Sequence, residues 1–334
     1  MSLDKPTRRR AITIFAAAAA GALSGGPACS TPADFEWHGV AMGADATILF
    51  NGIDPDVARA TIAEAEAEID RLEGALSLYR PDSELCRLNR ERWLFGPSGD
   101  MRRALSIALG ISAITGGLFD PTVQPLWETY VDWFTDSPEA GLPPDSIITP
   151  ARASVDWHRV SLDGEAIRSG PGQQLTLNGL GQGYVTDRVA ELLAARDLRH
   201  VLVDLGEQRA LAPREGGAPW LVRRIGAPPL RLANGALATS EGAGCVLGAA
   251  GAVHHLFDPR TGLSAAHWKR LTVHHRSAAV ADALSTALYI ASADEIKSIL
   301  PHLAGTVVWA RDQDDREWCW LSPPIDGVTL QDAG

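Results

Sequence analysis

Three oxygen-bearing side chains interrupt an otherwise apolar stretch, AVADALSTAL, at residues 279–288. On a helix, Asp282 and Thr286 lie one turn apart on the same face, with Ser285 beside them. A carboxylate in so apolar a helix needs a partner, and carboxylate and hydroxyl oxygens are ligands that suit Mg²⁺. The alternative is an aspartate in the first turn that only the helix dipole stabilises, and the sequence leaves both interpretations open.

A glycine-rich segment, LNGLGQGY, precedes a predicted helix at residues 177–184. Glycines allow a close backbone approach, and free N–H groups at a helix start favour an anion such as a phosphate. The glycines at 179, 181 and 183 match neither a dinucleotide-binding GxGxxG pattern nor a Walker A loop. A plain tight turn between two elements is the alternative.

Two other polar segments are candidates for contacts with a ligand. In SLYRPDSEL, at residues 77–85, the ring of Tyr79 stands beside arginine, aspartate and serine, a combination that can cover a flat ring and bind its polar edge. In GGLFDPTV, at residues 116–123, two glycines allow close backbone approach. For both segments the alternative is the end of a helix followed by a turn.

Histidines and cysteines do not form a pattern typical of a metal site. His254 and His255 precede the turn sequence DPRTG, but adjacent side chains usually point apart and no third ligand follows, so zinc is not predicted. The four cysteines stand far apart, at positions 29, 86, 245 and 319. This spacing excludes zinc-ribbon and CxxC motifs, and the count excludes a dense disulfide framework.

The hydrophobic spacing predicts helices and strands that mix without a regular β-α-β alternation, which favours an α+β architecture. Helices are expected over residues 56–76, 101–115, 184–195 and 278–291. Strands are expected over residues 45–50, 160–162, 174–177, 200–205, 220–225, 271–274 and 305–310. The Pro-, Ser- and acid-rich stretch 136–150 is expected to be a surface loop.

Composition limits the class of protein. The 334 residues are 46% apolar and 21% charged, as in globular proteins, and the formal net charge of −11 argues against nucleic acid as a partner. Residues 1–29 differ from the rest, because TRRR at 7–10 precedes an alanine-rich stretch. This pattern favours a twin-arginine export signal over a membrane anchor, hence a periplasmic or envelope location, and Cys29 is a candidate for lipid attachment.

Taken together and in this order, these segments resemble the ApbE family of flavin transferases, from about residue 37 to residue 321. The resemblance rests on an ordered set of motifs: AMG (41–43), SLYRPDSELCRLN (77–89), GGLFDPTV (116–123), LNGLGQGYVTDRV (177–189), VLVDLGEQRAL (201–211), HHLFDPRTG (254–262) and ADALSTAL (281–288). The resemblance implies one α+β domain over residues 30–334, with a T-fold-like core, mixed sheets with packed helices and two closely joined lobes.

The resemblance also implies an activity. Family members bind FAD and Mg²⁺, cleave the pyrophosphate, and attach FMN by a phosphoester bond to a Thr or Ser of an exported or membrane redox protein. On matching positions, the FAD site would be lined by Met42, Tyr79, Leu118, Phe119, Asp120, Gln182 and Leu256. The metal ligands would be the Gly179 carbonyl, Asp282 and Thr286, with Ser285 beside them, and His255 would be the base for the acceptor hydroxyl.

Three positions depart from the pattern of many family members. Thr176 stands where many have Asp, Gln182 where many have Lys, and Glu207 where many have Gly. Two other functions therefore stay open, an FAD pyrophosphatase that releases FMN and AMP, and a periplasmic FAD-binding maturation protein without transferase activity.

Overall fold

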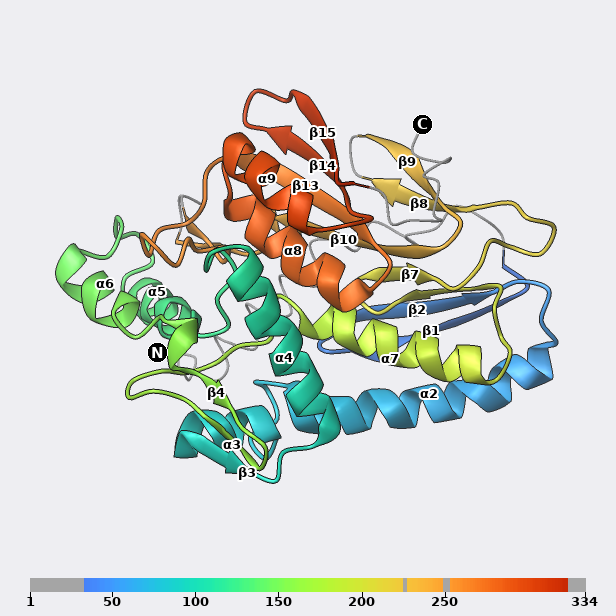
Figure 1. Cartoon of the computed structure of the whole chain (residues 1–334), viewed down its shortest axis with the longest axis horizontal. Coiled ribbons are helices and arrows are strands. Elements are labelled where there is room, and N and C mark those ends of the chain that lie inside the picture. The colour runs from blue at the N-terminus through green and yellow to red at the C-terminus, as the bar shows by residue number, and fades with distance from the viewer. Residues whose placement is uncertain (1–32, 225–226, 249–252, 324–334) are drawn as a thin grey trace, which may run out of the picture.

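The computed structural model describes residues 33–224, 227–248 and 253–323 (Figure 1). The predicted signal segment 1–29, including Cys29, lies outside these residues. Within them the chain forms a mixed α+β fold, as expected, with an eight-stranded antiparallel sheet as its largest element. No helix in the described ranges is long and apolar enough to span a membrane.

The main sheet has the strand order β1-β2-β6-β7-β10-β13-β14-β15. Its strands are β1 (Phe35–Ala41), β2 (Ala44–Phe50), β6 (Val201–Asp204), β7 (Gln208–Ala210), β10 (Gly235–Glu241), β13 (Trp268–His275), β14 (Val307–Asp312) and β15 (Glu317–Leu321). Four of the seven predicted strands correspond to β2, β6, β13 and β14. Two more are β4 (Ser161–Leu162) and β8 (Trp220–Arg224), which belong to smaller sheets.

Alternating side chains give the main sheet two buried faces. Ile48, Phe50 and Val203 contribute to the main apolar cluster together with the helices α2 (Pro55–Leu76), α4 (Gly99–Ile114), α7 (Gly181–Ala195) and α8 (Ala278–Ile290). Leu49 points the other way, into a second cluster with Trp220 of the hairpin formed by β8 and β9 (Ala227–Leu232). The helices therefore cover one face of the sheet and the hairpin covers part of the other (Figure 1).

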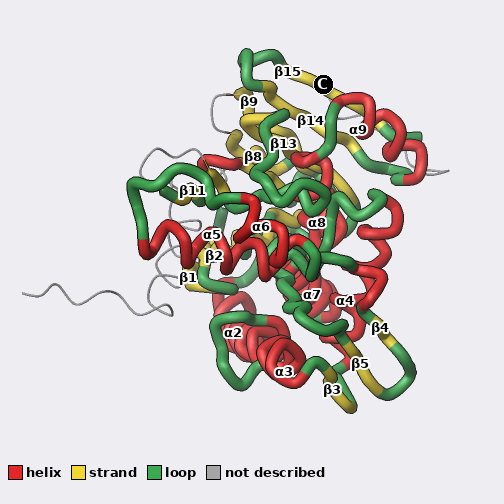
Figure 2. Tube along the Cα trace, turned by 90° about the vertical axis from the view of Figure 1, so that its left-hand side faces the viewer, coloured by secondary structure: helices red, strands yellow, loops and turns green. Residues whose placement is uncertain are grey.

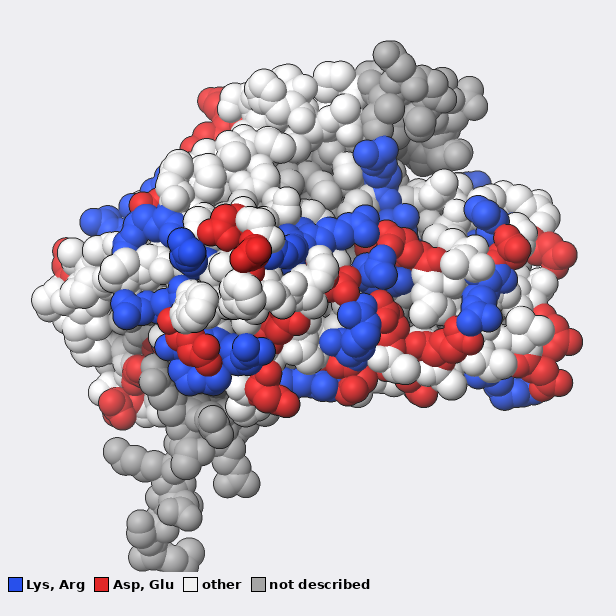
Figure 3. Space-filling model, turned by 60° about the horizontal axis from the view of Figure 1, so that its bottom comes forward, with Lys and Arg blue, Asp and Glu red and all other residues white. Residues whose placement is uncertain are grey.

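Ion pairs tie the helices of this layer together. Arg71 of α2 pairs with Asp100 of α4 at 2.8 Å, and Arg188 of α7 approaches the same carboxylate at 3.4 Å. Figure 3 shows basic and acidic side chains interleaved over the underside of the molecule. The four predicted helices match α2, α4, α7 and α8 within a few residues.

Other elements surround this core. A three-stranded sheet lies beside α3 (Glu84–Glu91) in Figure 2 and consists of β3 (Trp93–Phe95), β5 (Ala166–Arg168) and β4. A separate apolar cluster joins α5 (Gln124–Asp136) and α6 (Asp145–Arg152) to the short hairpin β11 (Val246–Leu247) and β12 (Val253–His254). The helix α9 (Ala293–Ile299) follows α8.

Two of the predicted elements are wrong. The expected surface loop 136–150 contains the start of α6. Ile148 is buried in the apolar cluster of α5 and α6, and this burial stabilises a helix that the Pro-, Ser- and acid-rich composition did not predict. The segment 174–177 is not a strand. The side-chain amide of Asn89 binds the N–H and the carbonyl of Leu175 at 2.7 and 2.8 Å, in place of a neighbouring strand.

Candidate functional site

The site is built where the first turn of α7 meets the first two turns of α8. Asp282 is 5% exposed, and its Oδ2 accepts a hydrogen bond of 3.0 Å from the backbone N–H of Gly183. Burial raises the pKa of Asp282 to about 7, because the charged form loses its water. The sequence predicted a carboxylate that needs a partner, and within the described residues Gly183 is the one hydrogen-bond donor to it.

The glycine-rich segment brings the predicted residues together. A Cβ atom at Gly179 would lie 2.9 Å from Thr286 Oγ1 and 3.2 Å from a ring carbon of Phe119. A Cβ at Gly181 would lie 3.1 Å from the terminal methyl of Met42. Three distant segments therefore converge on the glycines at 179, 181 and 183, through Met42, Phe119, and the α8 residues Asp282 and Thr286.

The donor set fits Mg²⁺ better than a softer ion. The Gly179 backbone lies against the Thr286 hydroxyl, and the Asp282 carboxylate is held nearby on the same helix. Within the described residues, no three His, Cys, Asp or Glu side chains are grouped so as to hold a metal ion. A site here would therefore use one carboxylate with hydroxyl, carbonyl and substrate oxygens, as is typical of Mg²⁺.

Ser285 has a different environment from Thr286. It is 1% exposed, and its hydroxyl lies 2.8 Å from Ser240 Oγ of β10 and donates to the Asp282 carbonyl at 2.9 Å. These contacts attach α8 to the sheet. Ser285 thus lies beside the predicted ligands, and its hydroxyl is already engaged.

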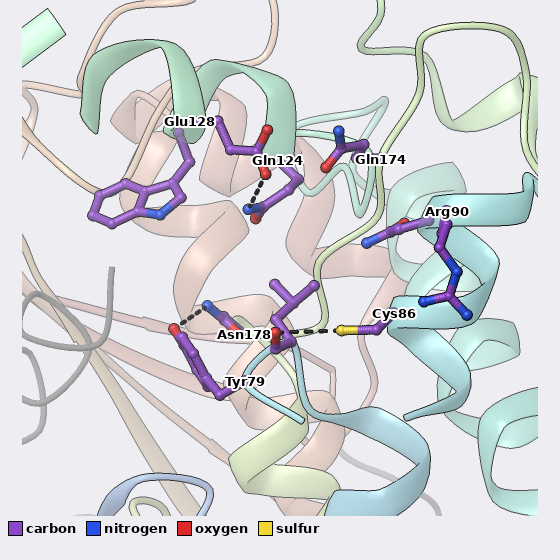
Figure 4. A pocket seen from close by; sticks show the side chains of 10 residues that line it. Tyr79, Cys86, Arg90, Gln124, Glu128, Gln174 and Asn178 are labelled. Atoms are coloured by element: carbon purple, nitrogen blue, oxygen red, sulfur yellow. Dashed lines mark hydrogen bonds between the residues drawn. The ribbon is translucent and has the colours of Figure 1, made fainter. Parts of the chain in front are cut away.

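Tyr79 borders a cavity of about 300 Å³, which is large enough for a ring system (Figure 4). Asn178, next to Gly179, donates to Tyr79 Oη at 3.4 Å and so connects this cavity to the glycine-rich segment. The cavity is lined by Leu78, Tyr79, Cys86, Asn89, Arg90, Gln124, Trp127, Glu128, Gln174 and Asn178.

Helix α5 supplies three of these residues that the sequence analysis missed: Gln124, Trp127 and Glu128. Figure 4 shows Gln124 and Glu128 on the opposite side of the cavity from Tyr79, and Gln124 Nε2 donates to Glu128 Oε1 at 3.3 Å. They were missed because α5 was not predicted. A proline at the start of the helix, Pro125, is the sequence signal that could have revealed it.

The residues of the LFD motif, 118–120, do not line this cavity and instead hold the loop that follows them. Leu118 and Phe119 are 3% and 4% exposed and pack in the main core. The carboxylate of Asp120 accepts hydrogen bonds from the N–H and hydroxyl of Thr122 and from the N–H of Trp157, at 2.8, 2.6 and 3.1 Å. Burial raises the pKa of Asp120 despite these bonds.

Gln182 lies over the turn that ends β6. A Cβ at Gly206 would lie 2.6 Å from Gln182 Cδ, and Gly206 has a φ of +104°, which favours glycine. Glu207, in the same turn, is buried and accepts a hydrogen bond from the N–H of Thr239 at 3.3 Å. Burial, with Asp282 and Asp204 nearby, raises the pKa of Glu207 well above its usual value.

The predicted base and its neighbour belong to the β12 region. His255 Nδ1 lies 3.3 Å from the Cys245 carbonyl, and burial lowers the pKa of His255 to about 4. The ring is therefore neutral at pH 7. Leu256 is buried in the main core, and its N–H donates to His254 Nδ1 at 3.2 Å. No contact in the described residues joins His255 to Asp282, Thr286 or Gly179.

Comparison with known proteins identifies the family. A sequence model described as the ApbE family matches residues 42–309, which include every predicted site residue. Proteins named FAD:protein FMN transferase from Klebsiella pneumoniae and Salmonella typhimurium are each 26% identical, covering 93% and 91% of this chain and 96% and 91% of their own.

Solved structures have the same fold. The ApbE protein of Thermotoga maritima superposes with a TM-score of 0.74 at 22% identity, over 85% of this chain and 96% of that one. The flavinyl transferase ApbE of Pseudomonas stutzeri gives 0.72 at 23% identity, over 85% and 94% of the two chains.

Proposed function

This chain belongs to the ApbE family, and on that premise we propose that it is a Mg²⁺-dependent FAD:protein FMN transferase. Its acceptor would be a Ser or Thr of an exported or membrane redox protein. The observation that carries the proposal is the convergence on one glycine-rich segment: the Asp282 carboxylate meets Gly183, and the Thr286 hydroxyl meets Gly179.

The chain's own groups divide the work of binding FAD. The cavity beside Tyr79 and Trp127 has aromatic walls and a polar edge, which suits one ring system of the dinucleotide. The backbone at Gly179 and Gly181 lets the pyrophosphate come close, because a side chain there would meet Thr286 or Met42. Asp282, Thr286 and the Gly179 carbonyl would hold Mg²⁺. When bound, the ion would offset the charge of the pyrophosphate and polarise a phosphoryl oxygen.

The transfer step needs few protein groups. The acceptor hydroxyl oxygen forms a bond to the phosphorus of the FMN half, the bond from that phosphorus to the bridging oxygen breaks, and AMP leaves. The hydroxyl proton needs an acceptor. We assign it to His255, whose Nδ1–H would donate to the Cys245 carbonyl and leave Nε2 free for the proton.

One observation weakens the case for transfer, and it keeps FAD pyrophosphatase activity and FAD binding without cleavage as further candidates. Gln182 lies against Gly206, and the neighbouring Glu207 is a buried acid, so this turn offers the phosphates no positive charge. With water in place of the acceptor hydroxyl, the same site would release FMN and AMP. A maturation protein that binds FAD without cleaving it is the third candidate function.

Incubation of the purified protein with FAD, Mg²⁺ and an acceptor redox domain, followed by mass spectrometry, separates the three functions. An acceptor heavier by one FMN supports the transferase, free FMN and AMP indicate the pyrophosphatase, and intact bound FAD indicates the carrier. The Asp282→Ala variant should lose Mg²⁺-dependent turnover and stay folded. The matched control is Asp294→Ala, since Asp294 is 92% exposed and forms a surface ion pair with Lys297. Equal turnover in the Asp282→Ala and control proteins would refute the metal site.

We also propose export. The arginines at 8–10 and the alanine-rich stretch up to residue 22 support a twin-arginine signal, with the protein in the periplasm or attached to the envelope through Cys29. Fractionation of cells followed by N-terminal sequencing tests this. An uncleaved cytoplasmic chain would contradict it.

A further inference from the structure

The outer strand of the main sheet, β1, has one edge that pairs with no other strand among the described residues, and this edge ends at the proposed site. β1 pairs with β2 along its whole length, from Phe35–Phe50 to Ala41–Ala44, and is the first strand in the sheet order. Natural sheets usually protect such edges with lysine, proline or a bulge. β1 has the sequence FEWHGVA and a regular register, so it has no lysine, proline or bulge, and Glu36 is its one carboxylate.

The hairpin geometry shows which backbone groups are available. Met42 and Gly43 have φ values of +52° and +81°, which is typical of a two-residue type I′ turn. Such a turn closes on a hydrogen-bonded pair, here Ala41 and Ala44, so alternate residues of β1 bond to β2. The N–H and carbonyl groups of the residues between them, Glu36, His38 and Val40, therefore point away from β2.

The side chains along this strand support docking of another chain. Val40 is 66% exposed, which makes it the most exposed of the large apolar side chains in the described residues. On the other face a Cβ at Gly39 would overlap the Trp37 indole, whose Nε1 donates to Glu66 of α2 at 3.0 Å. Trp37 thus attaches β1 to α2.

The end of β1 is joined directly to the site. The terminal methyl of Met42 lies against Gly181, and the Met42 N–H donates to Glu73 Oε1 at 2.7 Å. The other oxygen of Glu73 pairs with Arg80, the neighbour of Tyr79, at 2.7 Å. A strand added to β1 would therefore run up to the segment that holds the proposed FAD and metal groups.

We propose that the acceptor protein docks by strand addition: an extended segment next to its target Ser or Thr pairs with the free edge of β1 and delivers the hydroxyl beyond Met42. This inference rests on the proposed transferase function, because only a protein acceptor needs such an edge. Main-chain hydrogen bonds would supply affinity for varied acceptor sequences, and Val40 would favour an apolar side chain opposite it. The other edge of the sheet, β15, lies at the far end of the strand order and would not serve.

A proline at position 38 tests the proposal. His38→Pro removes an outward N–H and leaves the bonds to β2, since proline is tolerated on edge strands with its nitrogen facing solvent. His38→Ala is the matched control, because it removes the same imidazole, which lies 3.3 Å from Thr47 Oγ1, and keeps the N–H. Val40→Lys is a second variant that protects the edge by charge and leaves the backbone unchanged.

The probe is a recombinant, fluorescently labelled domain of an exported redox protein with its target Thr, together with its Thr→Val version. We expect His38→Pro and Val40→Lys to bind the domain about tenfold more weakly than wild type, because strand pairing is lost. Their kcat/KM for FMN transfer should also be about tenfold lower. His38→Ala should match wild type, and all should bind FAD equally. Wild-type binding of the domain by both edge variants would overturn the docking proposal. Absence of FMN transfer by wild type, with the domain bound, would instead contradict the transferase function.

Discussion

The backbone N–H of Gly183 donates to Oδ2 of Asp282 at 3.0 Å and thereby joins the first turn of α7 to the second turn of α8. The helices are so close here that a Cβ at Gly183 would overlap the Ala278 carbonyl oxygen and lie 2.8 Å from Asp282 Cβ. One glycine therefore sets both the packing of two core helices and the position of the proposed metal ligand.

We predict that Gly183→Ala lowers the free energy of unfolding by about 1–3 kcal/mol, because the added methyl forces α7 and α8 apart. Mg²⁺ affinity should fall as well, since Asp282 moves with α8. Chemical denaturation and Mg²⁺ titration measure the two effects. Gly110→Ala in α4 is the control: it meets open space and should be neutral or stabilising by up to about 1 kcal/mol. Equal unfolding curves for the two variants would contradict the prediction.

Asp187 positions the start of α8 from the side of α7. Its carboxylate accepts hydrogen bonds from Ser277 Oγ, Ala278 N and Ala279 N at 2.6, 2.8 and 3.1 Å, and also pairs with Arg209. We predict that Asp187→Ala costs about 3 kcal/mol of stability, because a buried charge pair and a helix cap are lost together.

The same variant should weaken Mg²⁺ binding without touching a ligand. Calorimetric titration of Mg²⁺ in the presence of FAD measures this, with unfolding followed in parallel. Asp187→Asn keeps an acceptor oxygen at the helix start and should retain part of both properties. An Asp187→Ala protein as stable as wild type would show that Ser277, the helix cap, suffices to hold α8.

The direction in which folding stability changes with pH follows from the burial of Asp282. Its pKa, raised to about 7, means that the folded protein holds a proton which the unfolded chain releases near pH 4. Without metal, stability from this group is therefore greatest below pH 4 and falls as the pH rises towards 7. The raised pKa values of Glu207 and Asp204 act in the same direction.

Mg²⁺ has to displace this proton. We predict that its affinity rises by about tenfold per pH unit below pH 7 and levels off above, because one proton leaves for each ion bound. Isothermal titration at several pH values in the presence of FAD measures the slope. In Asp282→Asn the slope should vanish together with tight binding. A flat profile in the wild-type protein would contradict release of a proton from Asp282.

Periodicity in the sequence was enough to predict the four helices that cover the main sheet and four of its eight strands. The helix 278–291 and its oxygen-bearing side chains emerge from spacing alone, and α8 spans Ala278–Ile290. Contacts between distant segments could not be predicted in this way, because spacing says nothing of which glycine will face which side chain. That Gly181 meets Met42 and Gly179 meets Thr286 is tertiary information.

The residues that line the cavity were likewise only partly predictable from the sequence. Tyr79 was expected there from the family resemblance, but Trp127 and Glu128 come from α5, which packs on its own apolar cluster. The segment containing Leu175 was misread as a strand because its alternating apolar residues are buried, while its backbone partner is the side chain of Asn89. When a side-chain amide takes the place of a neighbouring strand as the hydrogen-bond partner, the sequence contains no periodic pattern that reveals it.

The aromatic walls of the cavity give a prediction for FAD itself. Tyr79→Ala and Trp127→Ala should each weaken FAD binding by about tenfold, because a ring stacked on an aromatic side chain contributes about 0.5–1.5 kcal/mol beyond its buried area. Tyr79→Phe keeps the ring, loses only the 3.4 Å bond from Asn178, and should lose no more than about threefold. Flavin fluorescence titration in the presence of Mg²⁺ measures these affinities. Trp93→Ala is the control, since Trp93 is 51% exposed on β3 and does not line the cavity. FAD affinity unchanged by Tyr79→Ala would remove Tyr79 from the binding site and leave the cavity to another ligand.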